Sequence, residues 1–209
     1  MFRILGSLVA VLALAGAATV EAEVGFDIGQ LQLQESEGMT VVGLPKCVPA
    51  WEVGAPSVPI YCVQAVVPQD MKVTGVSLLD FDTEPVDGEY DVYPVQPARP
   101  LSDPGPFEFV PQDPQYYGPF EYPGEVVVAA HQGSMFGYNI ASAFVAPVQY
   151  NAEEKKLVFH ENVRFAFDLE PADLGYLEVR NRSLEAQQRI EAQIATIVIN
   201  PQDLTRYAP

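Results

Sequence analysis

Histidine, cysteine and basic residues are scarce in this chain. Its 209 residues include two histidines and two cysteines, and 11 lysines and arginines stand against 28 aspartates and glutamates, so the formal net charge is −17 at pH 7. Nucleic acids and anionic membranes bind through clusters of lysine and arginine, and this composition argues against both as partners. So few histidines and cysteines also leave little material for a metal centre or an activated nucleophile. We therefore expect no catalytic residue, no metal and no cofactor.

Long apolar runs are missing everywhere except at the N-terminus. There, Arg3 supplies a positive charge, residues 4–18 are rich in Leu, Val and Ala, and Val20-Glu21-Ala22 follows with small residues. This order is typical of a secretory signal, whereas a membrane-spanning helix needs about 20 apolar residues. We expect residues 1–22 to be a signal peptide and the mature chain to begin near Glu23. The product would be secreted or held at the cell surface, with no membrane segment after the signal is removed.

The two cysteines, Cys47 and Cys62, are 15 positions apart. An exported chain meets oxidising conditions, in which thiols persist as disulfides. Closing a loop of this length restricts the unfolded chain by roughly 3 kcal/mol in the entropic description. We therefore expect a Cys47–Cys62 disulfide. The alternative, a catalytic cysteine, needs a partner base, and the chain offers only His131 and His160, both in strand-like sequence.

Short runs of alternating polar and apolar residues, separated by Gly and Pro, indicate an all-β fold. Val163, Phe165, Phe167 and Leu169 alternate with polar or small residues and should share one face of a strand. An apparent phase shift after Gly29 suggests a bulge. The expected strands cover residues 58–67, 71–80, 90–93, 124–130, 136–148 and 157–169, with a hairpin connection at 151–156. Residues 23–170 are thus predicted to form an antiparallel sandwich or a jelly-roll-like body.

Residues 94–123 differ from the rest because they contain nine prolines. Proline removes a ladder donor and fixes φ, so this segment cannot be a central strand. We expect a long loop outside the core, and loops of this length are usually functional or disordered. Arg99 is the only lysine or arginine between Lys72 and Lys155, and a lone cation in an acidic loop is unusual. Its plainest interpretation is a surface ion pair of little energetic weight.

The β pattern ends at Pro171, and residues 171–206 are predicted to form a short helix and a tail. Residues 183–195 place Leu184, Ile190 and Ile194 on an apolar helix face. The tail that follows is polar, and we expect no core residue in it beyond Ile199.

Three motifs stand in order along the chain. They are Tyr122-Pro123-Gly124-Glu125, Pro147-Val148-Gln149-Tyr150-Asn151 and, at the end, Leu204-Thr205-Arg206-Tyr207-Ala208-Pro209. In this order and spacing they resemble the N-terminal propeptide of the gingipain-type (family C25) cysteine peptidases. The resemblance covers residues 54–209 and implies a non-catalytic β-sandwich propeptide. Such a propeptide holds its partner, a cysteine peptidase catalytic domain, latent and could assist its folding.

The resemblance also implies roles for two arginines. Gingipain propeptides place a basic side chain from a comparable loop into the specificity pocket, and Arg99 would fill that role here. Pro100 follows it, and a bond into a tertiary amide is a poor protease substrate, so Arg99 could occupy the pocket uncut. Arg206 is followed by Tyr207, an ordinary scissile bond that resembles the boundary with the mature enzyme. Residues 207–209 would then begin a peptidase that this sequence does not contain. The sequence would be either an N-terminal fragment of a longer precursor or a stand-alone inhibitor.

Two other interpretations remain open. The aromatic residues Tyr116, Tyr117, Phe120 and Tyr122 would suit a surface or carbohydrate-binding β module without a protease partner. Asp80, Asp82 and Glu84 could offer oxygen ligands to calcium, although no glycine-rich ligand loop surrounds them and a solvated strand face explains them as well.

Overall fold

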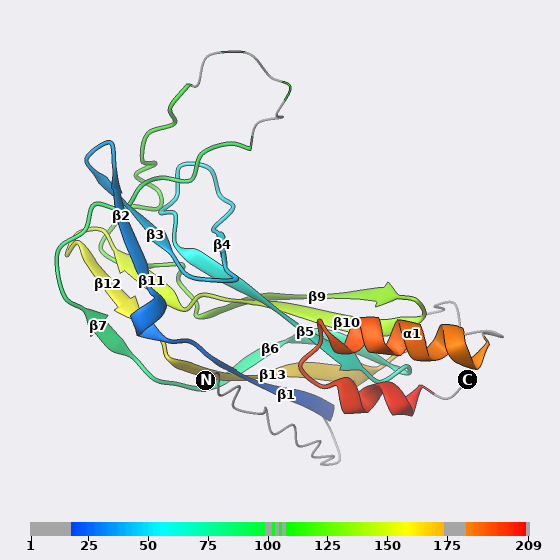
Figure 1. The fold of residues 1–209 in the computed structure, drawn as a ribbon. Coiled ribbons are helices and arrows are strands. Elements are labelled where there is room, and N and C mark those ends of the chain that lie inside the picture. The colour runs from blue at the N-terminus through cyan, green and yellow to red at the C-terminus, as the bar shows by residue number, and fades with distance from the viewer. Residues whose placement is uncertain (1–17, 99–101, 103–104, 106–107, 174–182, 208–209) are drawn as a thin grey trace.

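The described residues form antiparallel β-sheets with one α-helix near the C-terminal end (Figure 1). The computed structural model describes residues 18–98, 102, 105, 108–173 and 183–207. The strands are β1 (Ala18–Gly25), β2 (Gln32–Ser36), β3 (Met39–Gly43), β4 (Val48–Pro49), β5 (Pro59–Val67), β6 (Met71–Phe81), β7 (Glu84–Val86), β8 (Glu121–Tyr122), β9 (Val127–Met135), β10 (Tyr138–Val145), β11 (Val148–Asn151), β12 (Lys156–Phe159) and β13 (Asn162–Pro171). The helices are η1 (Ile28–Gln30), α1 (Leu184–Ala195) and η2 (Pro201–Arg206).

Two sheets pack face to face and form the main body. One has the strand order β1-β13-β6 and the other β4-β5-β10-β9. Strand β13 shows why they pack, because Val163, Phe165 and Phe167 have no exposed surface and Leu169 is 4% exposed. Successive strand residues point to opposite faces, so this alternation turns one apolar face inward. The other sheet contributes Val63, Ala65, Val67, Ala141, Ala143 and Val145 to the same core. The predicted antiparallel sandwich is confirmed.

A third sheet, with the order β7-β12-β11-β8, extends the body at one end around a second core (Figure 1). Tyr150, Leu157 and Phe159 are fully buried there. The strand expected at 136–148 is divided between β10 and β11 at Ala146 and Pro147, because proline has no N–H for a ladder bond. The strand expected at 157–169 is likewise divided into β12 and β13.

Two expected features differ in the structure. The strand predicted at 90–93 forms only an isolated bridge between Val92 and Thr40. Thr40 donates its N–H to Asp91 (2.6 Å) and accepts the N–H of Tyr93 (2.8 Å), which ties this segment to β3 without a full ladder. In place of the bulge after Gly29 there is the one-turn helix η1, whose N-cap Asp27 accepts the Gly29 N–H at 2.9 Å.

Strand β1 begins at Ala18, inside the segment that the sequence assigns to the export signal. It pairs with β13 from Ala18 opposite Leu169 to Gly25 opposite Asn162. Val20 and Ala22 are 1% and 4% exposed and belong to the main core. The folded body therefore starts earlier than the predicted residue 23.

The predicted C-terminal helix is present as α1. Ser183 caps it by accepting an N–H of the first turn at 3.2 Å, as serine commonly does at this position. Ile194 is fully buried against β5 and β10, and Ile190 is partly buried there. Leu184 is 75% exposed, so the predicted apolar face holds only in the second half of the helix.

The tail after α1 is part of the core. Leu204 is 4% exposed and Tyr207 is 3% exposed, and both pack in a third cluster with Tyr138 and Ile140 of β10. The expectation of no core residue beyond Ile199 is wrong. Leu204 and Tyr207, which complete this cluster, are isolated apolar residues in a polar sequence, so no hydrophobic periodicity predicts their burial.

Candidate functional site

The described parts of the proline-rich segment project from the body (Figure 1), and its two ends are tied together at the base. Gln96 makes this tie with one side-chain amide. Its Nε2 donates to the Val110 carbonyl (2.9 Å) and its Oε1 accepts the Val110 N–H (2.9 Å). Nε2 also donates to the carbonyl of Pro94 (3.0 Å). The side-chain amide thus bonds to the N–H and the C=O of one residue, as a backbone partner in a strand would. These bonds join two residues that are 14 positions apart.

Further bonds attach both ends of the loop to the body. On the outgoing side, Val95 donates its N–H to Ala55 (2.7 Å). On the returning side, Gln112 Nε2 and the Tyr117 hydroxyl both donate to the Val92 carbonyl, at 3.1 and 2.7 Å. Both described ends of the loop are therefore fixed to the body.

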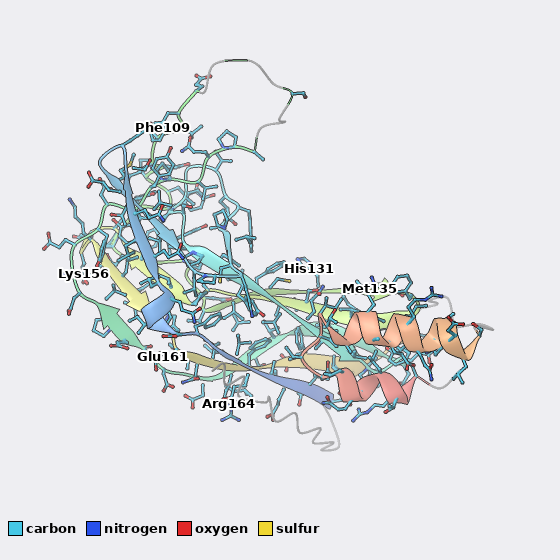
Figure 2. All side chains as sticks on the ribbon, in the orientation of Figure 1. Phe109, His131, Met135, Lys156, Glu161 and Arg164 are labelled. Atoms are coloured by element: carbon cyan, nitrogen blue, oxygen red, sulfur yellow. The ribbon has the colours of Figure 1, made fainter. Side chains whose placement is uncertain are left out.

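Phe109 marks the returning side of the loop in Figure 2, and its ring contacts Tyr93 edge-on at 5.7 Å. The candidate inhibitory residues Arg99 and Pro100 lie outside the described residues. The long loop predicted for residues 94–123 is confirmed over its described part, apart from the two-residue edge strand β8.

The family-motif residues brace the base on the returning side. Tyr122 of β8 pairs with Tyr150 of β11. The Tyr122 hydroxyl donates to Glu52 Oε2 (2.7 Å) and the Tyr150 hydroxyl donates to the Tyr90 carbonyl (2.8 Å). Burial, and next the hydrogen bond to Glu52, raise the pKa of Tyr122, so it remains a hydrogen-bond donor.

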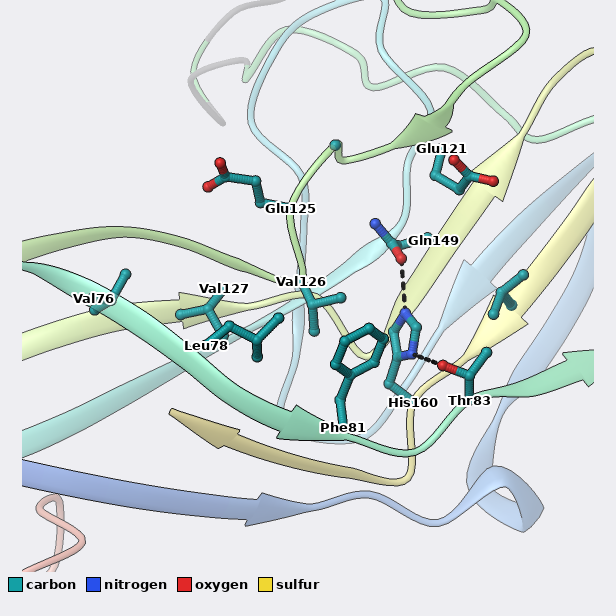
Figure 3. A pocket seen from close by; sticks show the side chains of 12 residues that line it. Val76, Leu78, Phe81, Thr83, Glu121, Glu125, Val126, Val127, Gln149 and His160 are labelled. Atoms are coloured by element: carbon teal, nitrogen blue, oxygen red, sulfur yellow. Dashed lines mark hydrogen bonds between the residues drawn. The ribbon is translucent and has the colours of Figure 1, made fainter. Parts of the chain in front are cut away.

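A chain of hydrogen bonds joins the two central motifs, residues 122–125 and 147–151. Figure 3 shows its bonds from Gln149 to His160 and from His160 to Thr83. Gln149 Nε2 donates to the Pro123 carbonyl (2.6 Å), which assigns Oε1 as the acceptor for His160 Nε2 (2.9 Å). His160 Nδ1 is then the acceptor for the Thr83 hydroxyl (3.2 Å). His160 is 1% exposed, and burial lowers its pKa. Since both ring nitrogens are bonded and the ring is neutral, this histidine serves the structure and offers no site for proton transfer.

A cavity of about 600 Å³ lies beside this chain of bonds. Phe81, Leu78 and Val126 give it an apolar wall, while Glu121 and Glu125 bring carboxylates to it (Figure 3).

The remaining motif residues have local roles. Gly124 and Glu125 are exposed. Pro147 accepts the N–H of His160 with its carbonyl (2.9 Å). Asn151 accepts the N–H of Glu154 (3.1 Å) in the turn between β11 and β12. The two central motifs therefore hold the β8–β11 junction, the place where the loop returns to the sheet.

Tyr116, Tyr117, Phe120 and Tyr122 do not form an exposed aromatic platform. Tyr116 packs edge-on against Tyr122 with ring centroids 5.6 Å apart, and Tyr117 packs against Tyr150 at 6.1 Å. Phe120 is 43% exposed. Three of the four aromatics that suggested a carbohydrate-binding module therefore belong to the second core or its margin.

The structure contradicts the predicted disulfide, because Cys47 and Cys62 are both free. Val48 pairs with Ile60. Extending this register by one residue sets Cys47 opposite Tyr61, and Cys62, the next residue of β5, points to the other face. Burial raises the pKa of the Cys47 thiol to about 11 and also raises that of Cys62. Neither thiol has the lowered pKa of a nucleophile.

The other candidates for chemistry are dispersed. His131 is exposed and its ring lies 6.2 Å from that of Phe144. Asp80 accepts the N–H of Phe81 (3.0 Å) and Asp82 accepts from Asn162 (2.8 Å), both on the surface. Among the described residues no group of three or more His, Cys, Asp or Glu side chains could hold a metal ion. The described part of the chain also has no helix long and apolar enough to cross a membrane.

Arg206 and Tyr207, the candidate processing residues, lie at the end of η2. The Arg206 side chain is 45% exposed and its Nε is 3.1 Å from Asp203 Oδ1. Tyr207 is buried beside Tyr138, with a ring centroid distance of 4.8 Å. The bond between the two residues thus follows an exposed side chain and precedes a buried one.

Sequence reasoning missed Gln96, which closes the loop, and Asn200, which holds the tail. Asn200 is fully buried and bonds to both backbone groups of Val66. Each is a single amide side chain without a surrounding motif, and the only available signal is its capacity to donate and accept at once.

Comparisons with known proteins agree on one family and one fold. The family model Propeptide_C25 matches residues 9–189. The fold is similar to that in the complex of the Porphyromonas gingivalis RgpB pro- and mature domains, with TM-score 0.66 and 16% identity, covering 93% of this chain and 96% of that one. It is also similar to that in a structure describing the zymogenic latency of gingipain K from Porphyromonas gingivalis, with TM-score 0.59 and 22% identity, covering 82% and 97%. No curated protein matches the chain.

Proposed function

The chain belongs to the Propeptide_C25 family, and we propose that it is a non-catalytic pro-domain that holds a gingipain-type cysteine peptidase catalytic domain latent. The projecting loop with its closed base carries this proposal. Gln96 and Val110 tie the two ends of the loop to each other, and bonds of Val95, Gln112 and Tyr117 attach these ends to the body. The two ends are therefore already ordered before a partner binds, which lowers the cost of ordering on binding.

Arg99 is the residue of this loop that would enter the partner. An acidic specificity pocket selects a basic side chain, and Arg99 is the only one between Lys72 and Lys155. Its bond leads into Pro100, which has a tertiary amide and resists cleavage. The loop would therefore bind in the manner of a substrate and remain intact.

Titration of a peptidase with the purified chain tests the proposal. Mature RgpB and the catalytic domain of gingipain K are the probes. We expect saturable inhibition of at least one of them at a 1:1 ratio. A variant in which a short Gly/Ser linker replaces residues 98–108 should unfold at the same temperature as the wild type but should no longer inhibit. Full activity of both enzymes at saturating chain, or full inhibition by the linker variant, would contradict it.

The Arg206–Tyr207 bond is the proposed processing site. Cleavage there would separate the pro-domain from a peptidase that follows it. In a precursor that carries the catalytic domain, Arg206→Ala should abolish the mature N-terminus at Tyr207 and leave the sandwich folded. Mass spectrometry of the product decides, and an unchanged N-terminus would remove Arg206 from this role.

Export by residues 1–17 is the proposed route to the partner. Ala15-Gly16-Ala17 satisfies the small-residue pattern of a signal cleavage site, and β1 begins at the next residue, Ala18. Cleavage there keeps Val20 and Ala22 in the core, whereas cleavage before Glu23 would remove them. The exported protein should therefore start at Ala18 by intact mass, and a start at Glu23 would refute this assignment.

A further inference from the structure

The outer edge of β5 is covered by two different segments. Strand β4 pairs with it at Pro59 and Ile60. Farther along, Val198 forms a parallel bridge with Gln64, and Ile199 donates its N–H to the Gln64 carbonyl (2.9 Å). The chain end thus continues the sheet on the side where β4 has stopped.

Asn200 extends this pairing with its side chain. Its Oδ1 accepts the N–H of Val66 (2.7 Å), and its Nδ2 donates to the Val66 carbonyl (2.9 Å). The second Nδ2 hydrogen reaches Asp203 Oδ2 (2.8 Å). Asn200 is fully buried, and its amide is satisfied on both atoms. The side chain therefore pairs with the edge of β5 in the way that the backbone of a neighbouring strand would.

Tyr207 closes the attachment from the other end. Its hydroxyl donates to the Val67 carbonyl and accepts the N–H of Asn139 (3.0 Å). The ring lies against Tyr138, and burial raises the Tyr207 pKa to about 12. Since Val67 and Asn139 are partners across β5 and β10, this hydroxyl bonds to groups of two neighbouring strands at once.

The segment between these two anchors contains the proposed processing bond. Most of it is wound into η2. Leu204 is buried two residues before Arg206, and Tyr207 is buried directly after it. An endopeptidase binds its substrate in extended form, with side chains on both sides of the scissile bond in its subsites. The attached segment exposes the side chains of Thr205 and Arg206. It offers neither an extended backbone nor the side chains of Leu204 and Tyr207, which are buried.

We propose that the edge of β5, together with Tyr138 and Asn139, is a docking site for residues 198–207, and that the Arg206–Tyr207 bond is cut only after this segment has been released. This inference rests on the proposed processing at Arg206. Hydrolysis itself is ordinary: water adds OH to the Arg206 carbonyl carbon and hydrogen to the Tyr207 nitrogen. The docking equilibrium sets the fraction of chains in which that bond is available.

Trypsin, which cuts after arginine and lysine, is a probe that is independent of any cognate enzyme. The rate of loss of the last three residues is measured by mass spectrometry for the whole chain, and for a synthetic peptide of residues 201–209 as the released reference. We expect the chain to be cut at Arg206 at least tenfold more slowly than the peptide. Equal rates would overturn the proposal.

Variants identify the anchor. Asn200→Ala lies outside η2 and should raise the rate at Arg206 at least fivefold, whereas Gln202→Ala, an exposed position in the same segment, should not change it. The Arg164–Phe165 bond in β13 reports global unfolding. A parallel rise at both bonds, or equal rates for the two variants, would refute local release.

A second variant keeps the test decisive if Asn200→Ala does not fold. Tyr207→Phe removes only the hydroxyl, and the peptide with the same change corrects for the preference of trypsin. The chain-to-peptide rate ratio should rise at least threefold, and an unchanged ratio would count against the docking site. These experiments use trypsin in place of the cognate enzyme, so a negative result would refute docking without bearing on latency. The Arg206→Ala precursor tests the processing site independently of docking.

Discussion

Replacement of Gln96 by alanine should weaken inhibition without destroying the fold. The change removes three hydrogen bonds, two to Val110 and one to Pro94. Each contributes about 0.5–1.5 kcal/mol net, and water can replace part of them because Gln96 is only partly buried. The free energy that favours the closed base, in which Gln96 is bonded to Val110, over the open base, in which these bonds are broken, should therefore fall by about 1–3 kcal/mol. If only the closed base presents the loop correctly, the inhibition constant rises about 5- to 150-fold.

Two measurements on the same variant separate opening of the loop base from loss of inhibition. Hydrogen exchange at the Val110 amide reports opening of the base, and titration of mature RgpB or gingipain K reports inhibition. Gln30→Ala is the control, since that exposed side chain donates only to nearby Asp27, at 3.3 Å, and it should change neither. Faster exchange at Val110 with an unchanged inhibition constant would show that the base does not position the loop.

Two further predictions concern the body. Thiol titration of the unfolded, unreduced protein should find both Cys47 and Cys62 reactive, and a single disulfide in the intact mass would contradict the register of β4 and β5. Burial lowers the pKa of His160, so above about pH 6.5 the ring is neutral in both the folded and the unfolded chain. As the pH falls through that value only the unfolded chain gains the proton, and stability declines. In His160→Gln this component should vanish, and identical stability profiles for the two proteins between pH 7.5 and 5.5 would refute it.

The sequence predicted what depends on short-range pattern. The alternation of Val163, Phe165 and Phe167 fixes the inward face of β13, and the prolines of residues 94–123 exclude a central strand. It could not predict contacts made by single polar groups across the fold. Asn200 bonds to Val66 over 134 positions and Tyr207 to Val67 over 140, and no local periodicity encodes such a pair. The expected disulfide rests on the spacing of the two cysteines and on an oxidising compartment, and neither carries information on the face to which each thiol points.

The most direct test of the central claim compares Arg99→Ala with Arg164→Ala in the titration of a gingipain-type catalytic domain. Arg164 is a suitable control because it lies on the side of the molecule away from Phe109 and the loop (Figure 2), half exposed and 3.9 Å from Glu21. Loss of one partner of a buried charge pair costs about 3–5 kcal/mol, so Arg99→Ala should raise the inhibition constant at least tenfold for a basic-specific enzyme. Arg164→Ala should leave it unchanged. Equal inhibition by the wild type and Arg99→Ala would contradict the account, and latency would then depend on steric coverage of the cleft.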